Sequence, residues 1–506
     1  MPTQYAGTYE TTLTVPVFRG IHQQQGDTNV NAEYAAYAEN CQTRGGALAP
    51  ARAPREAFAV MAGDALPTGA AIGTLACFHR RYGAAAEAAD VLIAAVQGRL
   101  YMRLGNALGW RQIAEGYLCD DWDFVTYELN TLDAPQEGAG GAQGGAGTPQ
   151  EADAPIDVLL MSNPVDGMIC VRGDTFEVVP VPTPKKFGVI CRHAERIWGS
   201  GIADDPDMLV YSAPYDPFDW AQNDEFPEDG AGDILQPSWD GDRFIALRNY
   251  GEYLLAFKRD TVWRVLGTDP GQYVMRQQYG EDGAVAENTI VTERSLVFML
   301  YAQGVSVYDG NGVQPLHRDA LRDVFARVNR EAIACATAVC WQHRYMLALP
   351  LDGCAHNNAV VVYDTVANTW MLRIGLAVAA FCRYGERLLF TSADEPGRVL
   401  AMDEGPAHPM RWEMPYQDQR GKNAVKSGFT IYLTPEADTQ AAITLTVQTE
   451  RRTKSRQLIV PAGDRRTRRV RIGARGRRWR LIIASEGGPM WKLVGGIQVD
   501  MEVDAD

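Results

Sequence analysis

The sequence predicts an all-β protein: a β-propeller of about seven blades with an extended N-terminal arm and a C-terminal antiparallel β-sandwich. Three observations predict this fold: a hairpin pattern that occurs seven times, a regular spacing between its later copies, and a change of pattern after residue 406. The 506 residues are 46% hydrophobic and 22% charged, which is typical of a globular protein with a large core. The 49 glycines and the short runs of β-branched and aromatic residues favour turns and strands over long helices.

The repeated hairpin consists of a strand, a short turn and a second strand rich in aromatic and aliphatic residues. Its seven copies lie at residues 91–102, 168–179, 189–198, 245–257, 290–298, 339–347 and 381–390. The last four copies are each followed by a further strand, at residues 261–265, 305–309, 360–364 and 399–403. The turns of these four copies, near residues 252, 295, 344 and 386, are 43, 49 and 42 residues apart.

A spacing of about 40 to 50 residues with several short strands is typical of propeller blades, because each four-stranded sheet must pack on the next. The segment from Tyr363 to Trp370 (YDTVANTW) also resembles the Y-D…W element of kelch-like blades. The alternative is a β-sandwich in which the hairpins recur by coincidence. We favour the propeller, with the arm at residues 1–57, the blades at 58–405 and the sandwich at 406–506.

Two segments inside the propeller look like insertions, and one in the arm looks helical. Residues 130–155 are rich in Gly, Ala and Gln without an apolar period, so we expect a surface loop that folding does not require. The acidic segment 223–233 is a smaller insert. Residues 29–40 (NVNAEYAAYAEN) predict a short helix. After Pro406, six segments alternate polar and apolar residues at period two, which predicts the separate sandwich.

The cysteines and the apolar segments give information on the cellular compartment of the protein. Nine cysteines, at positions 41, 77, 119, 170, 191, 335, 340, 354 and 382, are odd in number and form no C-x-x-C pair, so we expect reduced, mostly buried thiols. No apolar stretch approaches the ~18 residues that a membrane span needs, and the first residues lack the features of a signal peptide. We therefore expect neither a membrane anchor nor standard secretion.

The formal net charge of -15 is unevenly distributed along the chain. Between Glu450 and Leu481 there are 13 Lys and Arg residues and one acid, which leaves -27 on the rest of the molecule. This division predicts head-to-tail self-association or docking on an acidic partner. The predicted docking residues are Arg465, Arg466, Arg468, Arg469, Arg471, Arg475, Arg477 and Arg478.

These arginines have three interpretations. They dock on an acidic protein surface, they bind DNA phosphates, or they form a solvated strand face whose stems cover apolar residues. We favour protein docking over DNA, because a protein that lines a DNA channel must let the DNA slide and a dense basic ring would hold it.

The sequence contains no convincing catalytic, cofactor or metal site. The acidic residues Asp204, Asp205, Asp207, Asp216 and Asp219 lack the spacing of a Ca²⁺ loop and fit a solvated loop better than a glycosidase pair. Cys340, His343, Cys354 and His356 lack the usual zinc spacing, and strand residues 340 and 343 point to opposite faces. Glycine-rich phosphate loops are missing as well. The chain is therefore predicted not to be an enzyme.

Three segments together resemble a known family. They are FRGIHQQQ from Phe18, with the following residues 35–41 and 44–50; LVYSAPYDPFDW from Leu209; and residues 280–289 through 304–310, which end in GVSVYDG. These motifs resemble the propeller-type tail-nozzle and DNA-stabilisation proteins of short-tailed bacteriophages. The Arg that usually follows the N-terminal Pro is displaced here, to Arg52.

The resemblance implies a virion protein that forms a ring at the head-to-tail junction or tail nozzle and closes or lines the DNA exit channel. It implies contacts with other copies in a cyclic ring of six, with portal or adaptor proteins, with tail fibre or other tail proteins, and transiently with packaged DNA. Assembly would occur in the host cytoplasm. Two alternatives stay open: a receptor-binding or glycan-degrading tail component on a propeller scaffold, and a cellular β-propeller interaction scaffold.

Overall fold

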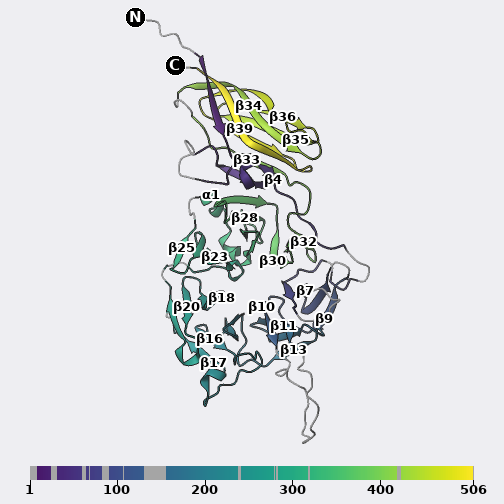
Figure 1. Cartoon of the computed structure of the whole chain (residues 1–506), viewed down its shortest axis with the longest axis vertical. Coiled ribbons are helices and arrows are strands. Elements are labelled where there is room, and N and C mark those ends of the chain that lie inside the picture. Colours follow the sequence, from purple (N-terminus) through teal and green to yellow (C-terminus); the bar gives the residue numbers. More distant parts are fainter. Residues whose placement is uncertain are drawn as a thin grey trace.

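The computed structural model describes residues 8–23, 31–59, 64–67, 69–81, 90–105, 108–129, 155–237, 241–278, 280, 283–316, 320–418 and 423–504. Within them, seven four-stranded blades form a ring, and a β-sandwich projects from one side of it (Figure 1). The predicted all-β fold, with a seven-bladed propeller and a C-terminal sandwich, is confirmed. Apart from Pro155, the insertion expected at residues 130–155 lies outside the described residues.

Blades 1 to 6 are antiparallel meanders of four consecutive strands. Blades 1 to 3 consist of β6 (Thr74–His79), β7 (Asp90–Val96), β8 (Arg99–Leu104) and β9 (Arg111–Glu115); β10 (Asp123–Leu129), β11 (Ile156–Asn163), β12 (Gly167–Arg172) and β13 (Val178–Val181); β14 (Val189–His193), β15 (Arg196–Ser200), β16 (Met208–Tyr211) and β17 (Gly232–Leu235). Blades 4 to 6 consist of β18 (Ala246–Tyr250), β19 (Tyr253–Phe257), β20 (Val262–Leu266) and β21 (Val274–Gln277); β22 (Val291–Glu293), β23 (Leu296–Tyr301), β24 (Gly304–Tyr308) and β25 (Val313–Pro315); β26 (Thr337–Trp341), β27 (Arg344–Leu349), β28 (Ala359–Asp364) and β29 (Thr369–Ile374).

Blade 7 closes the ring with a strand from the other end of the chain. Its first three strands are β30 (Val378–Tyr384), β31 (Arg387–Ser392) and β32 (Val399–Ala401), and its fourth is β5 (Arg55–Glu56), which pairs with β32. The first strands of adjacent blades contact one another around the ring, including β30 with β6. The N-terminal segment thus joins the last blade to the first.

The hydrophobic core of the propeller lies between its blades. Separate clusters of buried residues fill the junctions of blades 7 and 1, 1 and 2, 2 and 3, 3 and 4, and 4 and 5. Tyr308 of blade 5 is fully buried and meets Tyr250 of blade 4 edge to face at 5.0 Å. Tyr363 of blade 6 lies 6.1 Å from Phe298 of blade 5. Most of the free energy of burial is therefore gained only when neighbouring blades meet.

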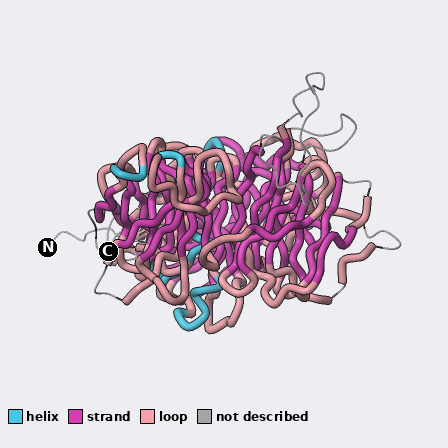
Figure 2. Tube along the Cα trace, turned by 90° about the horizontal axis from the view of Figure 1, so that it is seen from below, coloured by secondary structure: helices cyan, strands magenta, loops and turns pink. Residues whose placement is uncertain are grey.

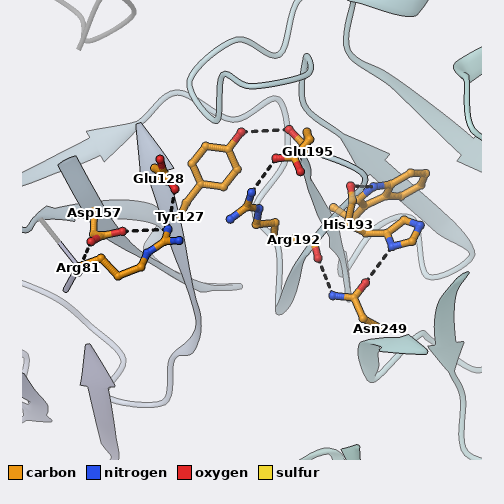
Figure 3. Close-up of polar contacts among 9 residues, drawn as sticks. Arg81, Tyr127, Glu128, Asp157, Arg192, His193, Glu195 and Asn249 are labelled. Atoms are coloured by element: carbon orange, nitrogen blue, oxygen red, sulfur yellow. Dashed lines mark hydrogen bonds and ion pairs between the residues drawn. The ribbon is translucent and has the colours of Figure 1, made fainter. Parts of the chain in front are cut away.

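Polar contacts join the same blades near the ends of their first strands (Figure 3). Arg81, after β6, forms ion pairs with Glu128 at 2.6 Å and Asp157 at 3.3 Å in blade 2. The Tyr127 hydroxyl of blade 2 donates to the Glu195 carbonyl in blade 3 at 3.0 Å. Asn249 of blade 4 donates to the Arg192 carbonyl of blade 3 at 2.6 Å. These contacts fix four successive blades in register.

The C-terminal sandwich has two sheets that share one core with blades 5 to 7. The first, which we call the β37 sheet, has the order β1 (Thr8–Val15), β39 (Trp491–Asp504), β34 (Val425–Ala437) and β37 (Arg468–Gly476). The second contains β33 (Met410–Glu413), β38 (Trp479–Ser485), β35 (Ala441–Thr449) and β36 (Thr453–Val460). It continues through β2 (Tyr37–Glu39) into β29, so blade 6 and the sandwich form one nine-stranded sheet.

The N-terminal segment is therefore woven into both units. Besides β1, β2 and β5 it forms the small hairpin of β3 (Cys41–Gln42) and β4 (Ala49–Pro50). The helix predicted at residues 29–40 is wrong for the described part from residue 31, because residues 37–39 pair with β33 and β29 instead. A partner strand satisfies the backbone of this short segment where a lone helix would be marginal.

Helical structure is confined to short turns in the described chain (Figure 2). It comprises α1 (Arg322–Phe325), η1 (Arg44–Gly46), η3 (Pro227–Asp229), η4 (Pro270–Gln272), η5 (Glu287–Thr289) and η6 (Arg330–Cys335). No helix among the described residues is long and apolar enough to cross a membrane.

Candidate functional site

The predicted docking arginines lie along one edge strand of the sandwich. β37 is the last strand of its sheet and pairs only with β34. Its residues alternate: Val470, Ile472 and Ala474 face the core, while Arg469, Arg471 and Arg475 are exposed on the outward face. Arg465 and Arg466 precede the strand and Arg477 and Arg478 follow it. At about 3.3 Å per residue, the eight arginines extend over roughly 40 Å, so they form a column rather than one compact patch.

Four of the eight side chains have partners in the fold. Arg468 is half-buried and pairs with Asp464 in the preceding turn. Arg475 pairs with Asp504 at 2.8 Å, Arg465 lies 4.0 Å from Glu436, and Arg478 stacks over the Tyr416 ring at 5.5 Å. Arg468 therefore has a structural role, since removing its side chain would leave the partly buried Asp464 carboxylate without its ion pair.

The other four are available for an external partner. Arg466, Arg471 and Arg477 have exposed side chains with no polar partner among the described residues, and Arg469 touches only the Tyr432 ring, at 5.9 Å. Exposed guanidinium groups of this kind form strong bidentate contacts with carboxylates. They are the part of the predicted set that fits a docking role.

The second edge strand of the sandwich increases the positive charge. β36 ends the nine-stranded sheet, lies beside β37 and has seven partly or fully exposed residues, among them Lys454 and Arg456. The two sheets therefore present two open strand edges side by side, both carrying cations. Charged residues on long edges also prevent unwanted strand pairing, which is a second role for these side chains.

An acidic surface lies at the other end of the molecule. The loop before β17 in blade 3 and that strand itself carry six exposed acids, Asp219, Asp224, Glu225, Glu228, Asp229 and Asp233. Residues 212–242 contain no Lys or Arg. In Figure 1, β17 lies at the bottom of the propeller and β34 to β36 lie at the top. The long axis of the molecule therefore runs from a basic end to an acidic end.

Ionisable groups that sequence analysis missed lie in the centre of the propeller. The first strands of the blades surround a cavity of about 400 Å³ that contains Asp121, Asp123 and Arg248. Glu287 lies at a neighbouring cavity with the same two aspartates. Burial and the Asp123 carboxylate raise the pKa of Glu287 to about 8. No sequence motif marks these residues, because they converge only when blades 2, 4 and 5 close the ring.

Two of the acids and two of the histidines considered from the sequence form ion pairs or close contacts within the fold. Asp207 pairs with the buried Lys258 of blade 4 at 2.5 Å, and Asp205 pairs with Lys185 at 2.8 Å. His343 lies 3.6 Å from Glu293, whereas His356 lies 3.0 Å from Asp394. All nine cysteines are free. In the described part of the chain, no group of three His, Cys, Asp or Glu side chains is arranged to hold a metal ion.

Comparison with known proteins gives likenesses in structure alone. No protein-family model and no curated protein matches this chain. A chain of the crystal structure of the mitotic checkpoint complex aligns over 69% of this chain and 98% of its own length, with 10% identity and a TM-score of 0.37. A chain of the crystal structure of BBS1N in complex with ARL6DN aligns over 70% of this chain and 96% of its own length, with 13% identity and a TM-score of 0.38.

The WD40 domain of Pan2 from Neurospora crassa also aligns, over 65% of this chain and 90% of its own length, with 10% identity and a TM-score of 0.33. Likenesses at this level say nothing about function. The strand topology itself defines the protein as a seven-bladed β-propeller with an attached sandwich.

Proposed function

We propose that this protein is a non-enzymatic β-propeller scaffold that assembles by docking the arginines of β37 on acidic protein surfaces, first of all on other copies of itself. The observation that carries this proposal is the separation of charge along the molecule. The exposed arginines lie at one end, and six exposed acids lie at the other, within residues 212–242, which contain no Lys or Arg. Contact between unlike ends is heterologous, and repeats of such a contact close into a ring when the rotation permits.

The finer proposal is a virion ring at the head-to-tail junction or tail nozzle of a bacteriophage. It is supported by the three resembling segments, which occupy separate parts of the fold: the N-terminal segment between propeller and sandwich, β16 with the loop after it, and blade 5. Six copies, portal or adaptor partners and tail fibres belong to this finer proposal. A cellular interaction scaffold is the alternative that needs only the fold and the charge separation.

Protein docking remains preferred over DNA binding for these arginines. The propeller cavity contains Asp121 and Asp123, whereas the arginine column lies on the sandwich, outside the ring of blades. In a ring of copies, the DNA exit channel would lie between the copies, and its wall would not require these arginines, because DNA must slide through it. The acidic remainder of the chain supplies carboxylates that match the guanidinium groups.

The test reverses exposed arginines at both ends of β37. In Arg465→Glu, Arg466→Glu, Arg477→Glu, we expect a folded monomer that no longer forms the assemblies that the wild type forms at low salt. A matched control, Arg259→Glu, Arg276→Glu, Arg322→Glu, changes exposed propeller arginines by the same charge and should assemble like the wild type. Mass photometry between ~50 mM and ~0.5 M salt measures both, since exposed charge pairs are screened at high salt.

Two results would overturn parts of the proposal. If the first variant still assembles but loses affinity for DNA, the arginines serve DNA. If the wild type stays monomeric at low salt, self-assembly is wrong. Negative-stain imaging with a phage portal complex then tests the finer proposal, which requires closed rings attached to the portal.

A further inference from the structure

The outward face of the β37 sheet carries two columns of opposite charge. β37 presents Arg469, Arg471 and Arg475, and two strands away β39 presents Asp500, Glu502 and Asp504. Between them, β34 contributes small or aromatic groups. The inner side of this sheet packs on the second sheet of the sandwich. Among the described residues, no other strand covers its outward side.

The two columns are aligned row by row. Arg471 is level with Thr430 of β34, which is level with Asp500. Arg475 is level with Ser427, which is level with Glu502. Because neighbouring strands are about 4.8 Å apart, the arginine and the carboxylate of a row are separated by roughly 10 Å, too far for most pairs to meet within one copy. Only Arg475 reaches across, to Asp504 at 2.8 Å.

A polar groove runs between the columns. Its volume is about 450 Å³, and Arg469 and Arg471 lie on one side with Glu10, Asp500 and Glu502 on the other. Two glycines keep it open: Gly428 has a φ of 62° at a β-bulge, and a Cβ added to Gly473 would meet no atom within 4 Å. The groove therefore leaves room for long side chains from a facing surface.

We propose that this face binds the same face of a second copy, related by a two-fold axis that runs along β34. Rotation about that axis exchanges the positions of β37 and β39 and keeps each row level. Arg471 of each copy then faces Asp500 of the other, and Arg475 faces Glu502. Three arginines and four carboxylates, including Glu10, make the face nearly neutral, so two such faces attract without net repulsion.

The contact is small. Four strands across and about seven residues along give roughly 450 Å² per copy, below the ~800 Å² per partner of a standard interface. We therefore expect a salt-sensitive dimer that forms at micromolar concentration. This isologous contact goes beyond the heterologous contact of the proposed function and does not depend on it.

Complementary charge reversal tests the proposal. One variant carries Arg471→Glu, Arg475→Glu and the other carries Asp500→Arg, Glu502→Arg. Each alone should dimerise at least about tenfold more weakly than the wild type, since every row becomes a like-charge pair. An equimolar mixture should restore the dimer, because one face is then acidic and the other basic. Sedimentation velocity at ~50 mM salt measures all three samples.

Controls separate this face from other effects. Arg451→Glu, Arg452→Glu makes the same charge change in the turn between β35 and β36, off the face, and should dimerise like the wild type. If Asp500→Arg disturbs folding, since Asp500 accepts hydrogen bonds from Thr12 and Gln498, the single changes Arg475→Glu and Glu502→Arg provide the same mixture test. Failure of the mixture to associate, or unchanged dimerisation of both variants, overturns the proposal. If both variants still form assemblies larger than a dimer and also dimerise like the wild type, the proposed function stands and this contact is refuted.

Discussion

The edges of the propeller blades differ from the edges of the sandwich. The outer strands of blades 1 to 5 have only 5, 4, 4, 4 and 3 residues. Two edge strands of the sandwich that lie side by side, β36 and β37, have 8 and 9 residues and carry six Lys and Arg residues and no acid. Short edges offer few backbone groups to a stray strand, whereas long edges need charged side chains to stay unpaired. The buried clusters of the propeller thus lie at the blade junctions, and the exposed cations lie at the sandwich edges.

Truncating an aromatic side chain at a blade junction should have the largest effect on stability. Tyr308→Ala removes a fully buried ring that packs on Tyr250 of the neighbouring blade. We expect a loss of about 3 to 5 kcal/mol in the free energy of unfolding, as for other buried aromatic residues. Chemical denaturation measures it, and Tyr308→Phe, which keeps the ring, should lose much less. A loss under about 1 kcal/mol in the alanine variant would contradict a core located between blades.

The segment that joins the two regions should be sensitive to one added methyl group. A Cβ at Gly20 would lie 2.3 Å from the Trp370 carbonyl oxygen and 2.8 Å from its nitrogen, in the outer strand of blade 6. Gly20→Ala must therefore displace this segment, at a cost of about 1 to 3 kcal/mol. Chemical denaturation measures this cost. Ala47→Ser, in the same segment but half-buried, is the control and should change the denaturation midpoint little. Equal midpoints for wild type and Gly20→Ala would mean that the segment does not hold the two regions together.

The propeller centre should make stability depend on pH. Because the pKa of Glu287 is raised from 4.5 to about 8, the folded chain keeps a proton that the unfolded chain releases. The contribution of Glu287 to the free energy of unfolding is fully present below about pH 4.5 and is lost as the pH rises towards 8. Glu287→Gln should reduce the fall in the free energy of unfolding between pH 5 and 9, by an amount on the order of a few kcal/mol, and thermal melts at each pH measure it. Parallel pH profiles for the two proteins would contradict the raised pKa.

The smallest effect on stability should come from the sandwich edge. Arg469→Val, Arg471→Val changes two exposed side chains and should shift the free energy of unfolding by less than about 0.5 kcal/mol. The long edge, however, loses the charge that keeps it unpaired, so light scattering should show aggregation at concentrations where the wild type stays clear. Arg469→Lys, Arg471→Lys keeps the charge and should stay clear as well. Clear solutions of the valine variant would show that the arginines do not protect this edge.

Local pairing explains which parts of the fold could be predicted. Each of the seven hairpins found in the sequence falls in a different blade, because strands joined by a short turn leave a continuous pattern. In blades 3 to 7 the hairpin is formed by the first two strands, but in blade 1 it is β7 with β8 and in blade 2 it is β12 with β13. In those two blades, long connections separate the first strand from the second and hide the earlier pair.

Pairing between distant segments explains what could not be predicted. β1 pairs with β39, so Thr12 lies opposite Asp500, and nothing local to either segment indicates its partner. The same holds for Arg55, whose strand completes blade 7, and for Asp123 and Glu287, which meet only in the closed ring. The sequence shows the cluster of arginines, but the alignment of these arginines with the carboxylates of β39 depends on strand order. The period of the apolar residues indicates which face of a strand is buried, but it does not indicate which strands lie beside it.

The pairing of β1 with β39 has a consequence for biosynthesis. β1 leaves the ribosome hundreds of residues before the strand that covers it, and at about 5 to 20 residues per second this interval lasts roughly 25 to 100 s. During that time the early strand has no permanent neighbour, and the face that we propose for dimerisation does not yet exist. Subunits can therefore recognise one another through this face only after translation of β39, which separates the folding of each polypeptide from its assembly in time.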